Sequence, residues 1–115
     1  MEIVNTINYD HFKQVEIRVG TVIKAEIFPE ARKPAFKLLV DFGPDIGKRK
    51  TSAQITTNYT IDRIVGKQVA AVINFAPKQI GPFMSECLLL GFPDITGEVV
   101  LISTDETVPN GGKLF

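Results

Sequence analysis

The chain has 115 residues, of which 44% are hydrophobic, and its formal net charge is zero at pH 7. This length suffices for one domain with one core and is too short for two, and the hydrophobic content argues against a disordered chain. Cys87 is the only cysteine, which excludes an internal disulfide and favours a buried apolar role. No apolar run reaches the ~18 residues of a membrane helix and we see no signal peptide, so we expect a cytoplasmic protein without membrane insertion.

The first predicted elements are a short helix and a long strand. Asn8 can cap a helix over residues 9–14. Residues 15–27 then alternate in polarity with period two, which predicts a strand whose odd-numbered residues, apolar apart from a threonine, share one face. Gly20 in the middle of this strand lets it bend, as strands in barrels do.

The later elements are short and are separated by Gly/Pro turns. Residues 36–42 predict a second strand with its even-numbered residues inward, and residues 48–55 predict a third strand that carries basic side chains. Thr60 can cap a single helical stretch that stops at Gly66. The remaining strands are predicted over residues 68–75, 85–92 and 98–103.

Sparse helix and short strands favour an all-β barrel or sandwich. A single helix between the third and fourth of five strands is the order of the OB-fold, a partly open Greek-key barrel. We therefore predict one domain over residues 1–115, a five-stranded OB-fold barrel with short helices and with N- and C-terminal extensions. The fold alone does not establish a function.

Residues suited to catalysis or metal binding are few. His11 is the only histidine, Ser85 lies outside the G-x-S-x-G pattern, and one cysteine with one histidine falls short of the usual zinc ligand set. The sequence has neither the P-loop motif nor the G-x-G-x-x-G motif. We therefore expect no enzymatic activity, no metal and no cofactor.

Charge is distributed unevenly along the chain. Nine Lys/Arg and three acidic residues lie between Ala31 and Pro82, whereas both flanking segments are net acidic. Ordinary solvated charge is one explanation, and a basic face for an anionic polymer is the other. Because the chain has no tryptophan and most of its eight phenylalanines fall at core positions, a folded RNA recognised through phosphates and shape is favoured over a single strand.

Three stretches resemble one known family. They are DHFKQVEIRVGTVIKAEIFPEA (10–31), NFAPKQIGPFMSECLLLGF (74–92) and VPNGGKLF (108–115). They are similar to the opening, the second signature and the closing segment of the tRNA-binding domain of free tRNA-binding proteins, synthetase extensions and the EMAP II cytokine module. The match covers about residues 10–115, and within the family the chain most resembles the CsaA type, a small secretion-related chaperone.

The resemblance implies an OB barrel, a homodimer, tRNA as a partner, and unfolded or exported polypeptides as further partners. The alternative is a polypeptide-binding secretion chaperone without physiological tRNA binding. On the family's signature positions and on charge, we predict RNA-binding residues Lys48, Arg49, Lys50, Gln54, Asn74, Lys78, Met84 and Ser85. Predicted peptide-binding residues are Phe28 and Met84, which lie near loops.

The segment at residues 76–83 connects two apolar strands and is expected at the barrel mouth. Pro77 and Pro82 limit its backbone freedom, and Gly81 permits a tight bend. A plain loop that closes the barrel, with Asn74 and Ser85 bonded to its backbone, is the alternative to a binding loop. Apolar residues of the two extensions are expected to bury against a second copy; they are Ile3, Val4, Ile7, Leu114 and Phe115.

Overall fold

The computed structural model describes residues 4–115, so Ile3, one of the residues predicted at a dimer interface, lies outside the described part. The elements, in chain order, are α1 (Tyr9–Gln14), β1 (Ile17–Ile27), β2 (Phe36–Asp41), β3 (Lys48–Ala53), α2 (Ile61–Ile64), β4 (Gln68–Val72), β5 (Lys78–Ile80), β6 (Phe83–Ser85), β7 (Leu88–Leu89), β8 (Gly91–Pro93) and β9 (Val99–Leu101). Both predicted helices are present. Asn8 caps α1 by accepting from the backbone of His11, and Thr60 caps α2 by accepting from the backbone of Arg63.

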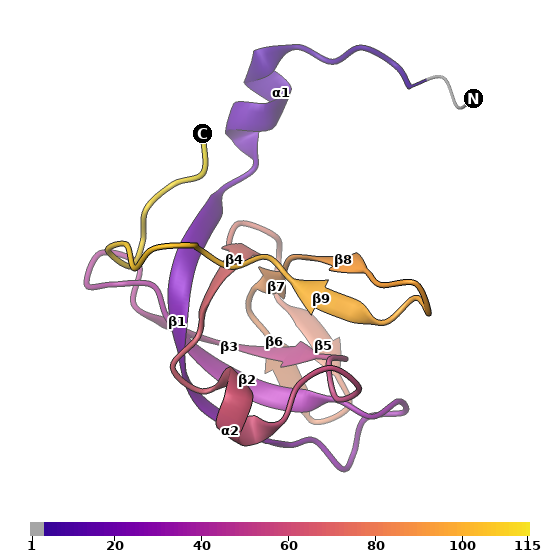
Figure 1. Ribbon diagram of the computed structural model, residues 1–115. Coiled ribbons are helices and arrows are strands. Elements are labelled where there is room, and N and C mark those ends of the chain that lie inside the picture. The colour runs from indigo at the N-terminus through magenta and orange to yellow at the C-terminus, as the bar shows by residue number, and fades with distance from the viewer. Residues whose placement is uncertain (1–3) are drawn as a thin grey trace.

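The main sheet is an antiparallel, nearly closed barrel with the strand order β3-β2-β1-β4-β7 (Figure 1). The edge strand β3 approaches the segment between β6 and β7, where the Glu86 backbone N–H donates to the Lys50 carbonyl at 2.8 Å. Helix α2 lies between β3 and β4 in the chain. This arrangement confirms the predicted OB-fold.

The core follows the alternation of β2, as predicted. Phe36, Leu38 and Val40 are buried, and Phe42 continues the pattern just beyond the strand. Ile64 of α2 is fully buried against the same cluster. Burial of side chains of this size stabilises the fold by about 1.5–3 kcal/mol each.

The prediction that the odd-numbered residues of β1 share one face is wrong. Gly20 and Val22 are buried, whereas Ile23 is exposed and Ile27 is 67% exposed. The pairing of β1 with β2 shifts register at Ile23, and such a bulge breaks the period-two alternation. Gly20 also has a packing role, because a Cβ there would lie 2.7 Å from a side-chain carbon of Val40.

The C-terminal tail covers the N-terminal half of β1. The Val19 N–H donates to Gly112, the Gly111 N–H donates to Val19, and the Leu114 N–H donates to Ile17, each through the backbone at 2.7–3.1 Å. Figure 1 shows α1 standing away from the barrel with the C-terminus ending near it. No residue of α1 is buried.

The chain after β4 forms more and shorter strands than the sequence predicts. The strand predicted over residues 85–92 is split among β6, β7 and β8, and β8 pairs with β9 in a separate hairpin. The predicted connection at residues 76–83 contains β5, which pairs with β6 across the two-residue turn Gly81–Pro82. Gly81 has φ +56°, as the first position of a type II′ hairpin turn requires, and Pro82 excludes type I′ because its φ is negative. None of the helices within residues 4–115 is long and apolar enough to cross a membrane.

Candidate nucleic-acid interface

A groove of 1380 Å³ opens between the β1–β2 connection and the β5–β6 hairpin. These two connections belong to the mouth at which OB-folds bind oligonucleotides and oligosaccharides. Residues 30–33 form one wall, residues 78–81 form the other, and the end of β3 with the following Gln54 and Ile55 lies between them. The connection predicted at residues 76–83 therefore contributes to the lining of this groove.

Cationic side chains line both walls of this groove. Arg32 and Lys33 lie on the β1–β2 connection, and Lys78 lies on β5. All three residues are exposed. Glu30 and Glu86 are the acidic residues in the same lining.

Phe75 is an exposed aromatic residue of the groove that sequence reasoning missed. The alternation of residues 68–75 predicts it on the core side of a strand. However, β4 ends at Val72, and the Phe75 side chain is 58% exposed. The only signal in the sequence is the proline two residues later, which favours an early strand end because proline has no N–H to donate to a neighbouring strand.

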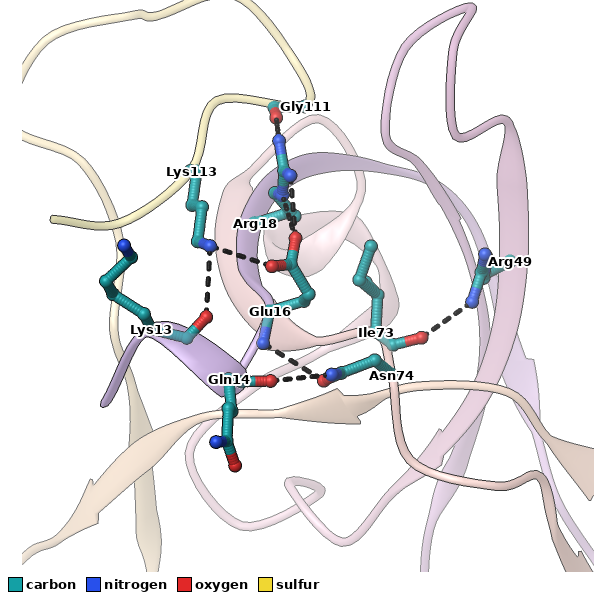
Figure 2. Close-up of polar contacts among 9 residues, drawn as sticks. All are labelled: Lys13, Gln14, Glu16, Arg18, Arg49, Ile73, Asn74, Gly111 and Lys113. Atoms are coloured by element: carbon teal, nitrogen blue, oxygen red, sulfur yellow. Dashed lines mark hydrogen bonds and ion pairs between the residues drawn. The ribbon is translucent and has the colours of Figure 1, made fainter. Parts of the chain in front are cut away.

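Three of the predicted RNA-binding residues follow each other in β3 and do not share a face. Lys48 and Lys50 are exposed, whereas Arg49 points to the opposite side, because successive side chains in a strand alternate. Arg49 Nη1 donates to the Ile73 carbonyl at 2.8 Å (Figure 2). Arg49 thus links β3 to the end of β4.

Lysines on the outer face of the barrel surround an aromatic pair. Lys37 Nζ and Lys50 Nζ lie 5.9 and 5.3 Å from the Phe83 ring centroid, within the range of cation–π interactions. The ring of Phe28 lies 5.4 Å from that of Phe83. We call Lys24, Lys37, Lys48 and Lys50 the lysine strip; the first, second and fourth line a small depression beside Phe83.

Phe28, one of the predicted peptide-binding residues, is buried. Its side chain is only 2% exposed, because it packs against Phe83 and lies under Lys37. Phe28 therefore has almost no surface for direct contact with a polypeptide. Met84, the other predicted peptide-binding residue, is 39% exposed on β6 and lies outside the groove lining.

Asn74 holds the junction of α1 and β1. Its Oδ1 accepts from the Glu16 backbone N–H at 3.0 Å, and its Nδ2 donates to the Gln14 carbonyl at 2.8 Å (Figure 2). Both polar groups of the side chain are therefore engaged within the chain. These partners lie at the α1–β1 junction and not in the connection at residues 76–83, so the signature asparagine supports the fold there.

The same region clamps the C-terminal tail. Glu16 accepts from Arg18 at 2.6 Å and from Lys113 at 2.7 Å through different carboxylate oxygens (Figure 2). Lys113 also donates to the Lys13 carbonyl, and Arg18 donates to the Gly111 carbonyl. The hydrogen bond from Lys113, followed by that from Arg18, lowers the pKa of Glu16 below its ordinary value.

Ser85 and Glu86 hold the barrel closed beside β3. Ser85 is 9% exposed, and its Oγ lies 3.0 Å from Thr51 Oγ1 and accepts from the Ser52 N–H at 3.3 Å. Glu86 Oε1 accepts from the Lys50 N–H at 3.0 Å. These side chains take the place of a neighbouring strand for two backbone donors of β3.

The predicted site residues are thus brought together only in part. Gln54 and Lys78 lie in the groove with exposed side chains, and Ser85 lines it with its hydroxyl engaged. Lys48 and Lys50 lie on the outer face, whereas Arg49 and Asn74 are bonded near the α1–β1 junction.

Cys87 is buried, as predicted, and burial raises the pKa of its thiol to about 11. The thiol is therefore protonated at neutral pH. Within residues 4–115, no group of three or more His, Cys, Asp or Glu side chains could hold a metal ion.

Comparisons with known proteins identify the class. A family model described as "Putative tRNA binding domain" matches residues 17–113. The chain is 39% identical over 105 residues to the methionine–tRNA ligase of Methanothrix thermoacetophila, a match that covers 91% of the chain and 15% of the ligase. The chain belongs to the tRNA-binding domain family, and it spans about 15% of the length of the methionine–tRNA ligases it matches.

Solved structures refine the comparison. The chaperone CsaA of Bacillus anthracis superposes with a TM-score of 0.90 at 42% identity, and that of Picrophilus torridus with 0.88 at 44% identity. Each match covers 96% of this chain and 100% of the other. A methionyl-tRNA synthetase-related protein of Pyrococcus horikoshii superposes with a TM-score of 0.85 at 29% identity, covering 97% of this chain and 100% of that protein.

Proposed function

We propose that this chain is a tRNA-binding protein that contacts RNA at the groove and along the neighbouring lysine strip. The observation that carries the proposal is the groove at the mouth of an OB barrel, with Arg32, Lys33 and Lys78 on its two walls. Family membership supports tRNA as the ligand. In this proposal the chain is one domain that acts by binding, without catalysis or a cofactor, in the cytoplasm.

The charges support a contact led by phosphates. Lys37 and Lys50 are held over an aromatic ring, and Lys24 and Lys48 are exposed beside them. Glu86, whose charge would repel a phosphate, follows Ser85 in the chain and has one oxygen bonded to the Lys50 N–H. That bond holds the carboxylate against the barrel wall, so it opposes an RNA phosphate less than a freely exposed carboxylate would.

Titration of the purified protein with bulk tRNA tests this proposal. Binding should weaken with added salt, by roughly 0.7–0.9 log units in affinity per log unit of salt for each phosphate contact. A Lys33→Glu, Lys78→Glu double variant should bind much more weakly, because both walls of the groove then repel phosphate. Failure of the unmodified protein to bind tRNA at low salt would contradict the proposal.

A second candidate function is an export-related chaperone that binds unfolded polypeptides. Exposed apolar side chains support it: Met84 on β6, and Phe75 and Leu88 in the groove. The two CsaA chaperones among the solved structures are at least 42% identical to this chain over their full length. Suppression of aggregation of an unfolded polypeptide by the purified protein would be the supporting result.

The proposed active form is a homodimer. Helix α1 buries none of its residues within one chain, and Val4, Ile7 and Tyr9 are exposed. Leu114 and Phe115 are exposed at the other end of the chain, which the Lys113 bonds bring close to α1. Apolar surface of this kind is typical of a protein interface.

A further inference from the structure

The exposed ring of Phe75 stands on a fixed piece of backbone. The preceding Ile73 donates its N–H to Glu16 and receives a hydrogen bond from Arg49 at its carbonyl. Asn74 is held through both ends of its side-chain amide (Figure 2). The chain therefore presents the ring in one place and does not bury it, although burial would stabilise the fold.

The surroundings of the ring combine apolar and cationic groups. Leu88 lines the same groove and is about half exposed. Arg32, Lys33 and Lys78 supply positive charge on both walls, and the Gln54 amide can both donate and accept hydrogen bonds. An aromatic face beside backbone-binding cations is the combination that binds single-stranded nucleic acid.

We propose that the groove takes a single-stranded segment of RNA, with a base stacked on Phe75 and the flanking phosphates beside Arg32, Lys33 and Lys78. This inference rests on the proposed function and names the part of the RNA that enters the groove. In a duplex the faces of each base are covered by its neighbours, so only an unpaired base can stack on the ring. The groove volume of 1380 Å³ exceeds the roughly 300–1,000 Å³ of a pocket for a drug-sized ligand, which leaves room for more than one nucleotide.

The exposed ring of Phe75 departs from the prediction that most phenylalanines lie at core positions. The composition predicts few exposed aromatic side chains and therefore favours a folded RNA recognised through phosphates and shape. The structure exposes Phe75 inside the charged groove, and the lysine strip outside it provides a separate surface for phosphates of a folded region. One RNA molecule can place a single-stranded segment in the groove and a folded region on the lysine strip.

The test compares ligands and matched variants by fluorescence anisotropy. The probes are a short labelled oligoadenylate, the same strand annealed to oligouridylate, an abasic strand of the same length, bulk tRNA, and a labelled unfolded polypeptide. Phe75→Leu should raise the dissociation constant for oligoadenylate by about tenfold or more and leave the abasic strand unaffected. Phe75→Tyr should restore binding, because tyrosine keeps the stacking face.

Phe92→Leu is the matched control, because Phe92 is 66% exposed but lies on β8 outside the groove lining. It should bind every probe like the unmodified protein, and circular dichroism should show that all variants are folded.

Three results would overturn the inference while leaving tRNA binding intact. They are tighter binding of the duplex than of the single strand, an unchanged affinity of Phe75→Leu for oligoadenylate, and an equal loss in Phe92→Leu. A fourth result, in which Phe75→Leu weakens only the binding of an unfolded polypeptide, would assign the groove to polypeptides. If the unmodified protein binds neither tRNA nor oligoadenylate, the proposed function fails as well.

Discussion

The hydroxyl of Ser85 lies 3.0 Å from the hydroxyl of Thr51, inside the wall of the barrel. Thr51 Oγ1 also donates to the Cys87 carbonyl at 2.7 Å, and Ser85 Oγ accepts from the Ser52 backbone. The serine of the family signature therefore closes the gap between β3 and the chain that leads to β7. A residue predicted to face RNA thus has a role in stability within the unliganded chain.

This relationship predicts that Ser85→Ala lowers stability. The Ser52 N–H loses its acceptor in a nearly buried position, so the free energy of unfolding should fall by about 1–3 kcal/mol. Urea denaturation followed by circular dichroism measures the change. Ser52→Ala is the control, because the Ser52 side-chain hydroxyl makes no hydrogen bond within residues 4–115. Weaker tRNA binding by folded Ser85→Ala at unchanged stability would instead assign the serine to the RNA.

The alternation within β3 predicts different effects for its three basic residues. Lys48→Ala and Lys50→Ala together should reduce the slope of log affinity against log salt by about 1.5, because each phosphate contact contributes roughly 0.7–0.9. Arg49→Ala should leave this slope unchanged. It should instead lower the free energy of unfolding by about 1–2 kcal/mol, because the hydrogen bond to the Ile73 carbonyl is lost.

Salt titrations with tRNA and urea denaturation of the same variants separate the two effects. If Arg49→Ala reduces the salt slope as much as either lysine variant, Arg49 reaches the RNA and the assignment to the fold is wrong.

The thermal stability of the protein should depend on pH through Asp94, which lies in the β8–β9 hairpin. Hydrogen bonds from Asn58 and then from Thr96 lower the pKa of Asp94 from 3.8 to about 2. A pKa that is lower in the folded state stabilises the fold above the unfolded value of 3.8, and this contribution is lost as pH falls toward 2. Asp94→Asn should therefore melt at a lower temperature than the unmodified protein at pH 6, with a difference that shrinks between pH 4 and about 2.

Thermal melts of both proteins across this range provide the measurement. Glu98→Gln is the control on the same hairpin. The difference between its melting temperature and that of the unmodified protein should not show the pH dependence expected for Asp94→Asn. A difference between Asp94→Asn and the unmodified protein that is independent of pH would show that the carboxylate charge is not the stabilising feature.

The fold was predictable where the signal is local. The alternation of β2 and the caps Asn8 and Thr60 depend on neighbouring residues alone, and the structure confirms them. The inward face of β1 was not predictable, because the register shift at Ile23 arises from pairing with β2 around the barrel. The exposure of Phe75 was not predictable for a related reason, because β4 ends at Val72 although the alternation of the sequence continues to Phe75.

The sequence predicted some of the residues that line the candidate groove, but not the hydrogen-bond partners of the signature side chains. The segment around Lys78 does form a wall of the groove, and Gln54 does face the same space. The roles of Asn74 and Ser85 depend on partners 34 to 60 residues away in the chain, at Gln14, Glu16 and Thr51. A sequence motif does not reveal whether a polar side chain is already engaged by such a partner.

The terminal extensions predict assembly as a two-fold dimer. Light scattering at micromolar concentration should give twice the mass of one chain, because Ile7, Tyr9 and Phe115 are largely exposed within residues 4–115. Ile7→Glu with Phe115→Glu should shift the mass toward the monomer, since both would bury a charge at the interface. Ile95→Glu, at an equally exposed apolar position in the β8–β9 turn, should remain a dimer. A monomer mass for the unmodified protein would refute the prediction.

Lys78 and Met84 should affect the two proposed ligands differently. Lys78→Glu should remove most tRNA binding, because it replaces attraction by repulsion in a groove that already contains Glu86. Polypeptide binding should survive this change. Met84→Ser should weaken polypeptide binding by the order of 1–2 kcal/mol if Met84 is an apolar anchor, and it should affect tRNA less, because Met84 lies outside the groove lining.

Titration of both folded variants with tRNA and with an unfolded polypeptide gives four affinities. Equal loss of both ligands in Lys78→Glu means that RNA and polypeptide share the groove. Unchanged affinity for both ligands means that the β5–β6 hairpin only connects strands of the barrel, and the roles assigned to Lys78 by family resemblance would be wrong. The expected pattern, with each variant affecting a different ligand, places polypeptide contact on the exposed side of β6 and RNA contact in the groove.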